Sequence, residues 1–400
     1  MKIAIVGGGT GGHIYPALAL AEELQEKDLD SEILFIGSPE GIENELVSKE
    51  RFTFETIKSR GMPRKLSLRA ISAPFVSIAG FFQARRVLRS FSPRILISTG
   101  GYVSLPVAFA AKTLGIPVLI HELNTIPGLS NRISGLFAKK ITLSFPEAMR
   151  YFPKRKVLLT GTPVRKKIIN AINEVSKSRL ELDLKRKTIL ILGGSQGARK
   201  INEVIIELLP DLLKENCQII HITGKNDFEH VISSTKNIAQ ETTDTSKVAE
   251  GKRKKEIIKI YKLYRPIPYM YNIWDALASA DLVISRAGGS TLAEILARGL
   301  PSILIPFPYS SEGHQDKNAR SIEGAGAAIV LKNDELSRDS LLCIIRELLA
   351  DKERLMTIAG AAKGLSSPEA SKTIIDSIYE ILDLPKVKSA GRKKKRALKQ

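Results

Sequence analysis

Four short stretches rich in glycine and hydroxyl residues follow apolar runs along this chain of 400 residues. They read GGGTGGH at 7–13, STGGYVS at 98–104, GGSQGAR at 193–199 and SRAGGSTLAE at 285–294. Glycine lets a ligand approach exposed backbone N–H groups, and a helix that begins after such a turn favours phosphate at its N-terminus. Four such turns predict a ligand that carries phosphate. Tight packing between strand and helix is the alternative explanation for any one turn alone.

The first turn satisfies Gly-x-Gly-x-x-Gly, the pattern of dinucleotide-binding sites, but its surroundings do not complete that pattern. A nicotinamide site needs an acidic residue about 20 residues further on, at the end of the second strand. Gly37 and Ser38 stand there, and Glu40 lies beyond the turn. Glu294 fits a ribose contact better, because it lies about one helical turn past the small residues of the fourth stretch. A plain surface position is the alternative for Glu294.

His13, at the end of the first turn, is the first candidate for a general base, because histidine titrates near neutral pH. The alternative is that His13 caps the turn or orients the diphosphate of an acceptor. Glu122 is the second candidate for the base. We expect no Asp-x-Asp pair of the kind that often holds a metal ion, and therefore no essential metal and no cofactor. Helix N-termini, backbone N–H groups and Arg165 would then neutralise the charge of a ligand that carries phosphate.

The turns are positioned by strand-like runs that alternate with helical patterns, which predicts parallel sheets with helices on both faces. The first helix is expected to open near Pro16, and the arrangement restarts at Lys187, so a second α/β domain is expected after a boundary near 161–165. YRPIPY at 264–269 is interpreted as a linker, and the polar segment 237–255 as a loop or insertion. Strands are predicted at 3–6, 32–36, 54–57, 95–98, 118–121, 140–143, 157–159, 187–192, 218–222, 282–285 and 302–305, and a last helix at 363–383.

The length and the apolar content of 43% are sufficient for two compact domains. Cys217 and Cys343 lie far apart, which suggests neither a disulfide framework nor a zinc site and fits a reducing compartment. The apolar run at 3–6 is too short for the core of a signal peptide, so export is not expected. No apolar run reaches the roughly 18 residues of a membrane-spanning helix, so any membrane contact should be peripheral.

The net charge of +19 is partly due to a basic terminus, because residues 385–400 hold eight basic and no acidic side chains. This tail is expected to be disordered, and it could solvate the chain, attract anionic lipid or contact nucleic acid. The segment 64–90 combines Phe75, Phe81 and Phe82 with basic and no acidic residues. It is interpreted as a membrane-interfacial patch, with an ordinary buried helix as the alternative.

A set of motifs from about residue 2 to residue 380 closely resembles, in matching order, the MurG family of bacterial N-acetylglucosaminyltransferases. The motifs are the first turn with its helix, STGGYVSLPVAFAAKTLGIPVLIHELN, TGTPVR, GGSQGAR, SRAGGSTLAEILARGLPSILIPFP and HQDKNA. The resemblance implies the GT-B fold, in which two Rossmann-like, doubly wound α/β domains face a cleft. It implies an acceptor- and membrane-facing domain at 1–163, a UDP-sugar-binding domain at 164–365, a helix at 366–384 that returns to the first domain, and a disordered basic tail at 385–400.

The reaction implied by the resemblance moves N-acetylglucosamine from UDP-N-acetylglucosamine to the C4 hydroxyl of undecaprenyl-pyrophosphoryl-N-acetylmuramoyl pentapeptide, with inversion at the anomeric carbon. This step converts lipid I to lipid II in peptidoglycan synthesis. Because the acceptor is a polyprenyl lipid, the implied place is peripheral, on the cytoplasmic face of the inner membrane, with its anionic surface as a partner. No nucleic-acid partner is expected.

Residues of this sequence that match the family's binding motifs are candidates for substrate contacts. Leu123 departs from the family, which commonly has glutamine there, and Met270 stands where isoleucine is usual, in a backbone contact to uracil. By the resemblance, the turn residues approach donor and acceptor, Ser195 contacts the UDP phosphates, Glu294 the ribose and Gln315 the sugar. The substrate-binding candidates are Thr10, Gly11, Gly12, Asn124, Arg165, Ser195, Met270, Gly289, Ser290, Thr291, Leu292, Ala293, Glu294 and Gln315.

Three other functions stay open from the sequence. A UDP-N-acetylglucosamine 2-epimerase also has two domains and uses the same donor, so it is the nearest alternative. A basic nucleic-acid-binding protein is suggested by charge alone, because no recognised nucleic-acid module is present. A nicotinamide oxidoreductase remains possible from the first turn.

Overall fold

The structure is a computed structural model that describes residues 1–8, 11–39, 43–59, 68–194, 197–215, 217–244 and 262–385. The chain divides into two compact units. The first contains residues 1–123 and 127–163 and the chain from Glu369 onward, and the second contains 124–126 and 164–368. The division between Pro163 and Val164 lies where the second domain was expected to begin, whereas residues 124–126 belong to the second unit and that unit extends to Pro368 instead of residue 365.

The first unit is built on a seven-stranded parallel sheet with the order β3-β2-β1-β4-β5-β6-β7. The order reverses between β1 and β4, which places a topological switch point at this pair. The predicted strands of this half are all present, with ends that differ by no more than two residues. They are β1 (Lys2–Gly7), β2 (Glu32–Gly37), β3 (Thr53–Thr56), β4 (Ile95–Gly100), β5 (Val118–Glu122), β6 (Lys140–Leu143) and β7 (Val157–Leu159).

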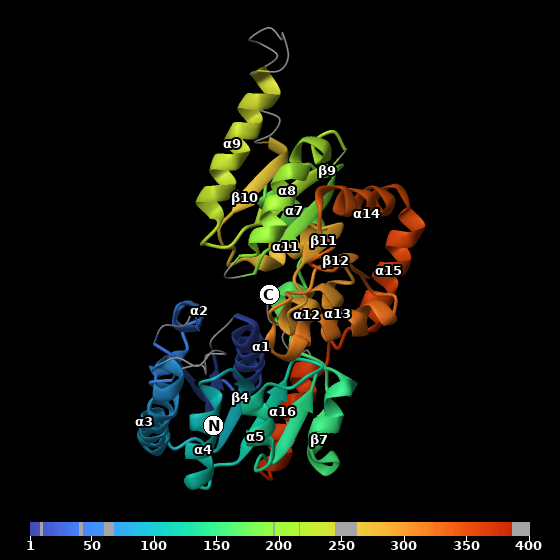
Figure 1. Cartoon of the computed structure of the whole chain (residues 1–400). Coiled ribbons are helices and arrows are strands. Elements are labelled where there is room, and N and C mark those ends of the chain that lie inside the picture. Colours follow the sequence, from blue (N-terminus) through green and yellow to red (C-terminus); the bar gives the residue numbers. More distant parts are fainter. Residues whose placement is uncertain are drawn as a thin grey trace, which may run out of the picture. The chain divides into compact units, whose positions relative to one another are not determined.

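Helices cover both faces of the first sheet because its central strands are apolar on both sides. Ala4 and Val6 of β1 pack on one face with Leu88 and Val107, whereas the alternate residues Ile3 and Ile5 are buried on the other. On that second face α1 packs against α16, which also contacts β6 and is drawn in red in Figure 1. The helices are α1 (Gly11–Lys27), α2 (Glu43–Lys49), α3 (Leu68–Phe91), α4 (Ser104–Thr113), α5 (Leu129–Gly135) and α16 (Ala370–Ile381), with short 3-10 turns at Pro146–Tyr151 and Lys154–Lys156.

Two of the helix predictions need correction. The first helix begins at Gly11, so Pro16 lies inside it and not at its start. The glycine turn therefore leads directly into the helix, and its last residues form the first helical turn. The last expected helix, 363–383, is interrupted after Gly364, and α16 begins at Ala370. Pro368 lies in the break, and a proline disfavours the helical conformation of the residue before it.

The second unit repeats the same topology in a six-stranded parallel sheet with the order β10-β9-β8-β11-β12-β13. YRPIPY is not a linker: its first four residues form β10, an edge strand, where the missing N–H of Pro266 can be tolerated. The two-residue strand β13 had no sequence signal. The strands are β8 (Lys187–Leu192), β9 (Cys217–Ile222), β10 (Tyr264–Ile267), β11 (Leu282–Ser285), β12 (Ser302–Leu304) and β13 (Ile329–Val330).

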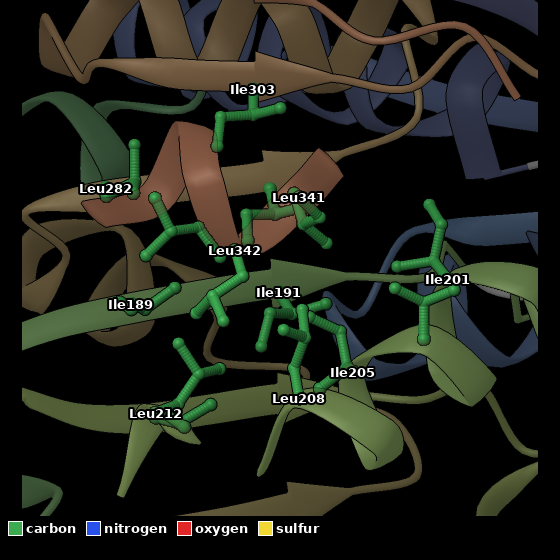
Figure 2. Packing of buried hydrophobic residues seen from close by; sticks show 14 of the residues in the cluster. Ile189, Ile191, Ile201, Ile205, Leu208, Leu212, Leu282, Ile303, Leu341 and Leu342 are labelled. Carbon is green, nitrogen blue, oxygen red and sulfur yellow. The ribbon is translucent and has the colours of Figure 1, made fainter. Parts of the chain in front are cut away.

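Alternate residues of β8 also supply two separate cores in the second unit. Ile189 and Ile191 pack against α8 and α14, whose side chains gather over the strand in Figure 2, and Leu190 and Leu192 pack on the opposite face. The helices are α6 (Lys166–Ile169), α7 (Asn173–Arg179), α8 (Arg199–Leu212), α9 (Phe228–Asp244), α11 (Ile273–Ser279), α12 (Gly289–Arg298), α13 (His314–Gly324), α14 (Arg338–Ala350) and α15 (Lys352–Gly364), with a 3-10 turn at Ser311–Gly313.

The polar segment at 237–255 was expected to be a loop, but its first part is helical. Helix α9 continues to Asp244, so the absence of a regular apolar pattern did not mark the end of the helix. The rest of that segment, and the basic tail from residue 386, lie outside the described residues.

Candidate functional site

The four glycine turns follow the two strands that flank the switch point in each unit. GGGTGGH follows β1 and STGGYVS begins within β4, and these strands are parallel neighbours. GGSQGAR follows β8 and SRAGGST follows β11, which are again parallel neighbours. The carboxyl ends of strands at a switch point are where open α/β sheets bind ligands. Each unit thus has one candidate ligand site built from two turns.

His13 is held in the tautomer that a general base requires. Its Nδ1 lies 2.8 Å from the backbone oxygen of Thr99. A carbonyl oxygen only accepts, so Nδ1 carries the proton and the lone pair is on Nε2. The ring lies against Gly100, where a Cβ would be 3.1 Å from His13 Nδ1 and where φ is +103°. Only glycine fits this backbone and this contact without strain.

Glu122 is buried beside the loop that follows β5. One carboxylate oxygen accepts from Leu123 N at 2.9 Å, and the other accepts from Gly128 N at 3.3 Å and Asn131 Nδ2 at 2.8 Å. These bonds engage both oxygens in holding the loop and the start of α5, so the geometry favours His13 over Glu122 as the base. Asn131 was not predicted from the sequence, because its partner lies nine residues away in a different element.

A second buried acid, Glu43, also escaped the sequence reasoning. Its Oε1 accepts from Ser38 N at 3.1 Å and Ser38 Oγ at 2.7 Å, and Tyr102 donates to Ser38 Oγ at 3.2 Å. A Cβ at Gly8 would lie 2.5 Å from Glu43 Oε1, so the first turn rests on this carboxylate. The carboxylate of Glu43, at the start of α2, therefore lies beside the residue that follows β2, but it accepts hydrogen bonds from the protein's own Ser38.

Glu294 lies on α12, the helix that follows the fourth turn, and it is 8% exposed. Burial raises the pKa of this carboxyl to about 7, and attraction to Arg165 opposes part of that rise. The plain surface position is therefore wrong for Glu294. Arg165 is 5% exposed and immediately precedes α6, and its guanidinium carbon lies 5.6 Å from the ring centre of Trp274. The remaining candidates on α12 form the turns before Glu294: Gly289, Ser290, Thr291, Leu292 and Ala293.

A buried hydrogen-bond chain lies under the third turn. The Tyr264 hydroxyl donates to His221 Nδ1 at 2.8 Å, and His221 Nε2 donates to Asn202 Oδ1 at 2.9 Å. Burial lowers the pKa of His221 to about 3, so the ring stays neutral and this direction of donation persists.

Asn202 connects these hydrogen bonds to the third glycine turn. Its amide donates to Thr223 O at 3.0 Å and to Asp227 Oδ2 at 2.9 Å. A Cβ at Gly197 would lie 2.8 and 2.9 Å from these same two oxygens, and φ there is +87°. The third turn therefore packs against two oxygens that are held in place by the hydrogen bonds through Tyr264, His221 and Asn202.

Asn318 on α13 links two segments of the second unit. Its Oδ1 accepts from Thr125 N at 2.9 Å, and its Nδ2 donates to Asn124 Oδ1 at 3.0 Å and to Ala287 O at 3.2 Å. The predicted residue Asn124 is thus tied to the fourth turn through a residue that was not predicted. Leu123, the departure from the family, is buried.

The other predicted residues are near the ends of the strands or outside the described residues. Gln315 is the second residue of α13, and its Oε1 accepts from Phe307 N at 3.0 Å, which leaves its amide N–H groups as the side that could meet a sugar. Met270 follows β10 and packs against the core below α12. Gly11 and Gly12 form the start of α1. Thr10 and Ser195 lie outside the described residues.

The acidic residues give no metal site within the described ranges, where no group of three or more His, Cys, Asp or Glu side chains could hold an ion. The expectation that Asp-x-Asp is absent is wrong, because one occurs at Asp28 and Asp30, between α1 and β2. It lies at the amino ends of the strands, away from the glycine turns. Asp28 accepts there from Ser31 Oγ at 2.7 Å and pairs with the N-terminal amine at 3.3 Å.

One face of α3 is both apolar and basic. Ile78 and Phe82 are 56% and 63% exposed, and Arg86 and Arg89 continue the same exposed stripe. The opposite face, with Ala84 and Leu88, is buried. Side chains before Val76, including Phe75, are outside the described residues. No helix in the described parts combines the length and apolarity needed to cross a bilayer.

A second surface of the first unit has the same character. Leu136 is 72% exposed, and its backbone oxygen accepts from Lys156 Nζ at 2.8 Å. The pKa of Lys156 is lowered by burial and by three neighbouring cations: Arg155, Lys112 and Lys139. Phe137, the residue after Leu136, packs against Phe109 with ring centres 5.0 Å apart.

Comparison with known proteins places the chain in a glycosyltransferase family. Residues 3–143 match the glycosyltransferase family 28 N-terminal domain, and residues 188–374 match the family 28 C-terminal domain. A relative from Halothermothrix orenii is 44% identical over 95% of this chain and 99% of its own length. One from Desulforamulus reducens is 40% identical over 96% of this chain and 99% of its own. Both are named UDP-N-acetylglucosamine–N-acetylmuramyl-(pentapeptide) pyrophosphoryl-undecaprenol N-acetylglucosamine transferase.

Solved structures agree with this placement. The crystal structure of Acinetobacter baumannii MurG is 27% identical, covers 95% of this chain and 99% of its own, and has a TM-score of 0.67. A putative UDP-N-acetylglucosamine 2-epimerase from Listeria monocytogenes reaches the same TM-score at 13% identity, with 96% of each chain covered. The epimerase therefore shares the fold, whereas sequence identity over the full length separates the transferases from it.

Proposed function

This chain belongs to the family of UDP-N-acetylglucosamine–N-acetylmuramyl-(pentapeptide) pyrophosphoryl-undecaprenol N-acetylglucosamine transferases, and we propose that it completes the lipid-linked disaccharide of peptidoglycan. N-acetylglucosamine moves from UDP-N-acetylglucosamine to the C4 hydroxyl of the undecaprenyl-pyrophosphoryl muramoyl pentapeptide. One observation carries the proposal: in a chain 44% identical to such a transferase, each switch point has two glycine turns, with His13 at one and Glu294 at the other.

The second unit binds the donor in this proposal. The Glu294 carboxylate accepts hydrogen bonds from the ribose hydroxyls, and the Arg165 guanidinium neutralises negative charge on the nucleotide. The start of α12 and the third turn add backbone N–H groups and a helix dipole that favour the diphosphate. We propose that these groups replace a metal ion, which is supported by the lack of a carboxylate cluster among the described residues.

The first unit activates the acceptor. The C4 hydroxyl oxygen forms a bond to C1 of the donor sugar as the bond from C1 to the UDP oxygen breaks, and the hydroxyl proton passes to His13 Nε2. Displacement from the side opposite UDP inverts the configuration at C1. The tautomer fixed by Thr99 supports this role, because Nε2 already has its lone pair.

The enzyme acts at the inner surface of the cell membrane in this proposal, bound peripherally. The exposed stripe Ile78, Phe82, Arg86 and Arg89 can insert apolar side chains among acyl chains and place its arginines at anionic headgroups. The surface around Leu136 and Lys156 offers the same combination. Partial burial of Lys or Arg stems in such surfaces keeps the charges in the headgroup region.

Transfer of labelled N-acetylglucosamine to a short-chain analogue of the lipid acceptor tests the proposal. We expect acceptor-dependent UDP release with equal amounts of labelled disaccharide product, unchanged by a chelator. Product formation that stops with the chelator and returns with a divalent ion would overturn the metal-independent mechanism. Formation of the 2-epimer, with UDP release in the absence of acceptor, would instead indicate an epimerase.

A further inference from the structure

Trp274 is the one tryptophan of the chain, and two cations of α6 and its start lie over its ring. The Arg165 guanidinium carbon is 5.6 Å from the ring centre and Lys167 Nζ is 5.4 Å from it. Trp274 lies in the first turn of α11 and packs against the core that contains Ile168 and Leu277. Its ring therefore connects a fixed helix to a charged side chain of the donor site.

The two cations differ in their surroundings. Arg165 is buried, whereas Lys167 is exposed. A cation over an indole face is stabilised by about 0.5–1 kcal/mol at exposed sites and by about 2 kcal/mol or more when desolvated. The contact with Arg165 should therefore be the stronger one, and Lys167 offers a matched control on the same ring.

The backbone that carries Arg165 is fixed separately. Arg298 on α12 donates to the backbone oxygens of Ile168, Ile169 and Ala171 at 2.9–3.2 Å, so the end of α6 is tied to the helix that bears Glu294. Glu294, with its pKa near 7, is ionised in only part of the molecules at neutral pH and is an incomplete counter-charge for Arg165. The indole face attracts the guanidinium at any pH.

We propose that Trp274 is a positioning residue for donor binding, because its indole face holds the Arg165 guanidinium where the anionic nucleotide meets the second unit. The inference rests on the proposed function, since Arg165 must face the nucleotide. The side chain acts through Arg165 and has no contact with the reacting atoms in this assignment. It should affect the affinity for the donor and leave the chemical step unchanged.

The test compares full-length Trp274→Leu, Trp274→Phe and Lys167→Gln with the unsubstituted enzyme. Calorimetry gives the Kd of UDP, and the transfer assay gives KM for UDP-N-acetylglucosamine and kcat. We expect Trp274→Leu to raise Kd and KM about three- to tenfold with kcat within about twofold, since a tenfold change corresponds to 1.4 kcal/mol. Trp274→Phe keeps an aromatic face and should retain most of the affinity, and Lys167→Gln should match the unsubstituted enzyme.

A double-mutant cycle that combines Trp274→Leu with Arg165→Met tests whether Trp274 affects UDP binding through Arg165. If Trp274 acts through Arg165, adding Trp274→Leu to Arg165→Met raises Kd no further. Independent, additive losses would overturn the proposal, and so would equal Kd values in the Leu and unsubstituted proteins. Absence of UDP binding by the unsubstituted enzyme would refute the proposed function instead.

Fluorescence provides a readout that does not depend on the stability of the leucine variant. Because Trp274 is the sole tryptophan, its emission reports its contacts directly. We expect Arg165→Met to shift the emission and to reduce its response to added UDP, whereas Lys167→Gln should leave the response intact. An emission response that is identical in all three proteins would contradict the assigned contact.

Discussion

Replacing Glu294 by glutamine should make the second unit more stable at alkaline pH and at the same time impair donor binding. Burial raises the pKa of this carboxyl from 4.5 to about 7. The folded protein therefore holds the proton more tightly than the unfolded chain does. Stability contributed by this group is greatest below pH 4.5, falls as the pH rises towards 7, and is constant above that.

The size of the effect follows from the interval between the two pKa values. At 1.36 kcal/mol per pH unit, ionising Glu294 costs about 3 kcal/mol of folding free energy above pH 7. A glutamine of the same shape has no proton to lose and avoids this cost. At pH 8 the free energy of unfolding of Glu294→Gln should exceed that of the unsubstituted protein by up to about 3 kcal/mol, and at pH 4.5 the two should agree.

Urea unfolding between pH 4.5 and 8 measures this difference. Trp274 lies in the second unit, so its fluorescence emission reports the unfolding of that unit. Glu207→Gln, on the exposed side of α8, is the control and should track the unsubstituted protein at every pH. Equal unfolding midpoints for Glu294→Gln and the control at pH 8 would refute the reasoning about burial.

Donor binding gives the second half of the same prediction. The affinity of the unsubstituted enzyme for UDP-N-acetylglucosamine, whose diphosphate is esterified at both ends and keeps its charge in this range, should decrease as the pH falls below 7. The reason is that ribose hydroxyls donate to the ionised carboxylate. In Glu294→Gln the affinity should be lower at pH 8 and independent of pH in this range. A variant that binds UDP as tightly as the original would show that Glu294 does not contact the nucleotide.

Three further variants, one of them a triple substitution, separate the roles of the remaining residues. His13→Ala should lower kcat about 100-fold or more while the Kd of UDP stays unchanged, and a loss of only a few-fold in the transfer assay would exclude His13 as the base. Charge reversal at Arg86 and Arg89 of the exposed stripe and at the half-buried Arg85 beside it should weaken sedimentation with anionic vesicles and leave UDP affinity intact; unaltered vesicle binding would remove the proposed surface. Asn202→Leu should weaken UDP binding measured by calorimetry, because the third turn loses the group that fixes Thr223 O and Asp227. Unchanged affinity for UDP in a folded Asn202→Leu protein would show that the hydrogen bonds of Asn202 serve only the stability of the fold.

The strands and the glycine turns could be predicted because their signals are local. Apolar runs of four to six residues give strands, and glycines directly after them mark the carboxyl ends where a ligand can approach the backbone. The prediction for YRPIPY was wrong because its two prolines oppose a central strand. The strand β10 lies at the sheet edge and contains only Pro266, which an edge position tolerates. The prediction for the end of α9 was wrong because residues 237–244, NIAQETTD, are mostly polar and leave little periodic signal.

The side chains that hold the turns could not be predicted, because their partners are distant in the sequence. Asn318 binds Thr125 across 193 residues, and Thr99 binds the His13 ring across 86. Neither spacing has a pattern that one sequence could reveal. Glu43 is closer to Ser38, yet its buried position on the first turn depends on the packing of α2 against the sheet. Local patterns therefore identify the turns, and the fold determines which side chains support them.

The sheets of the two units have corresponding strand orders, and each unit has one pair of glycine turns, but the buried acidic side chains have different partners. In the first unit Glu43 and Glu122 accept hydrogen bonds from the protein's own loops, so neither is arranged to bind ribose. In the second unit Glu294 is buried beside a cation, with a pKa that burial has raised to about 7. A ligand whose hydroxyl groups donate hydrogen bonds to Glu294 can offset the free energy of ionising this buried carboxyl, because it stabilises the ionised carboxylate. These electrostatics support our proposal that the nucleotide binds the second unit, although the glycine pattern of the first unit resembles a dinucleotide site more closely.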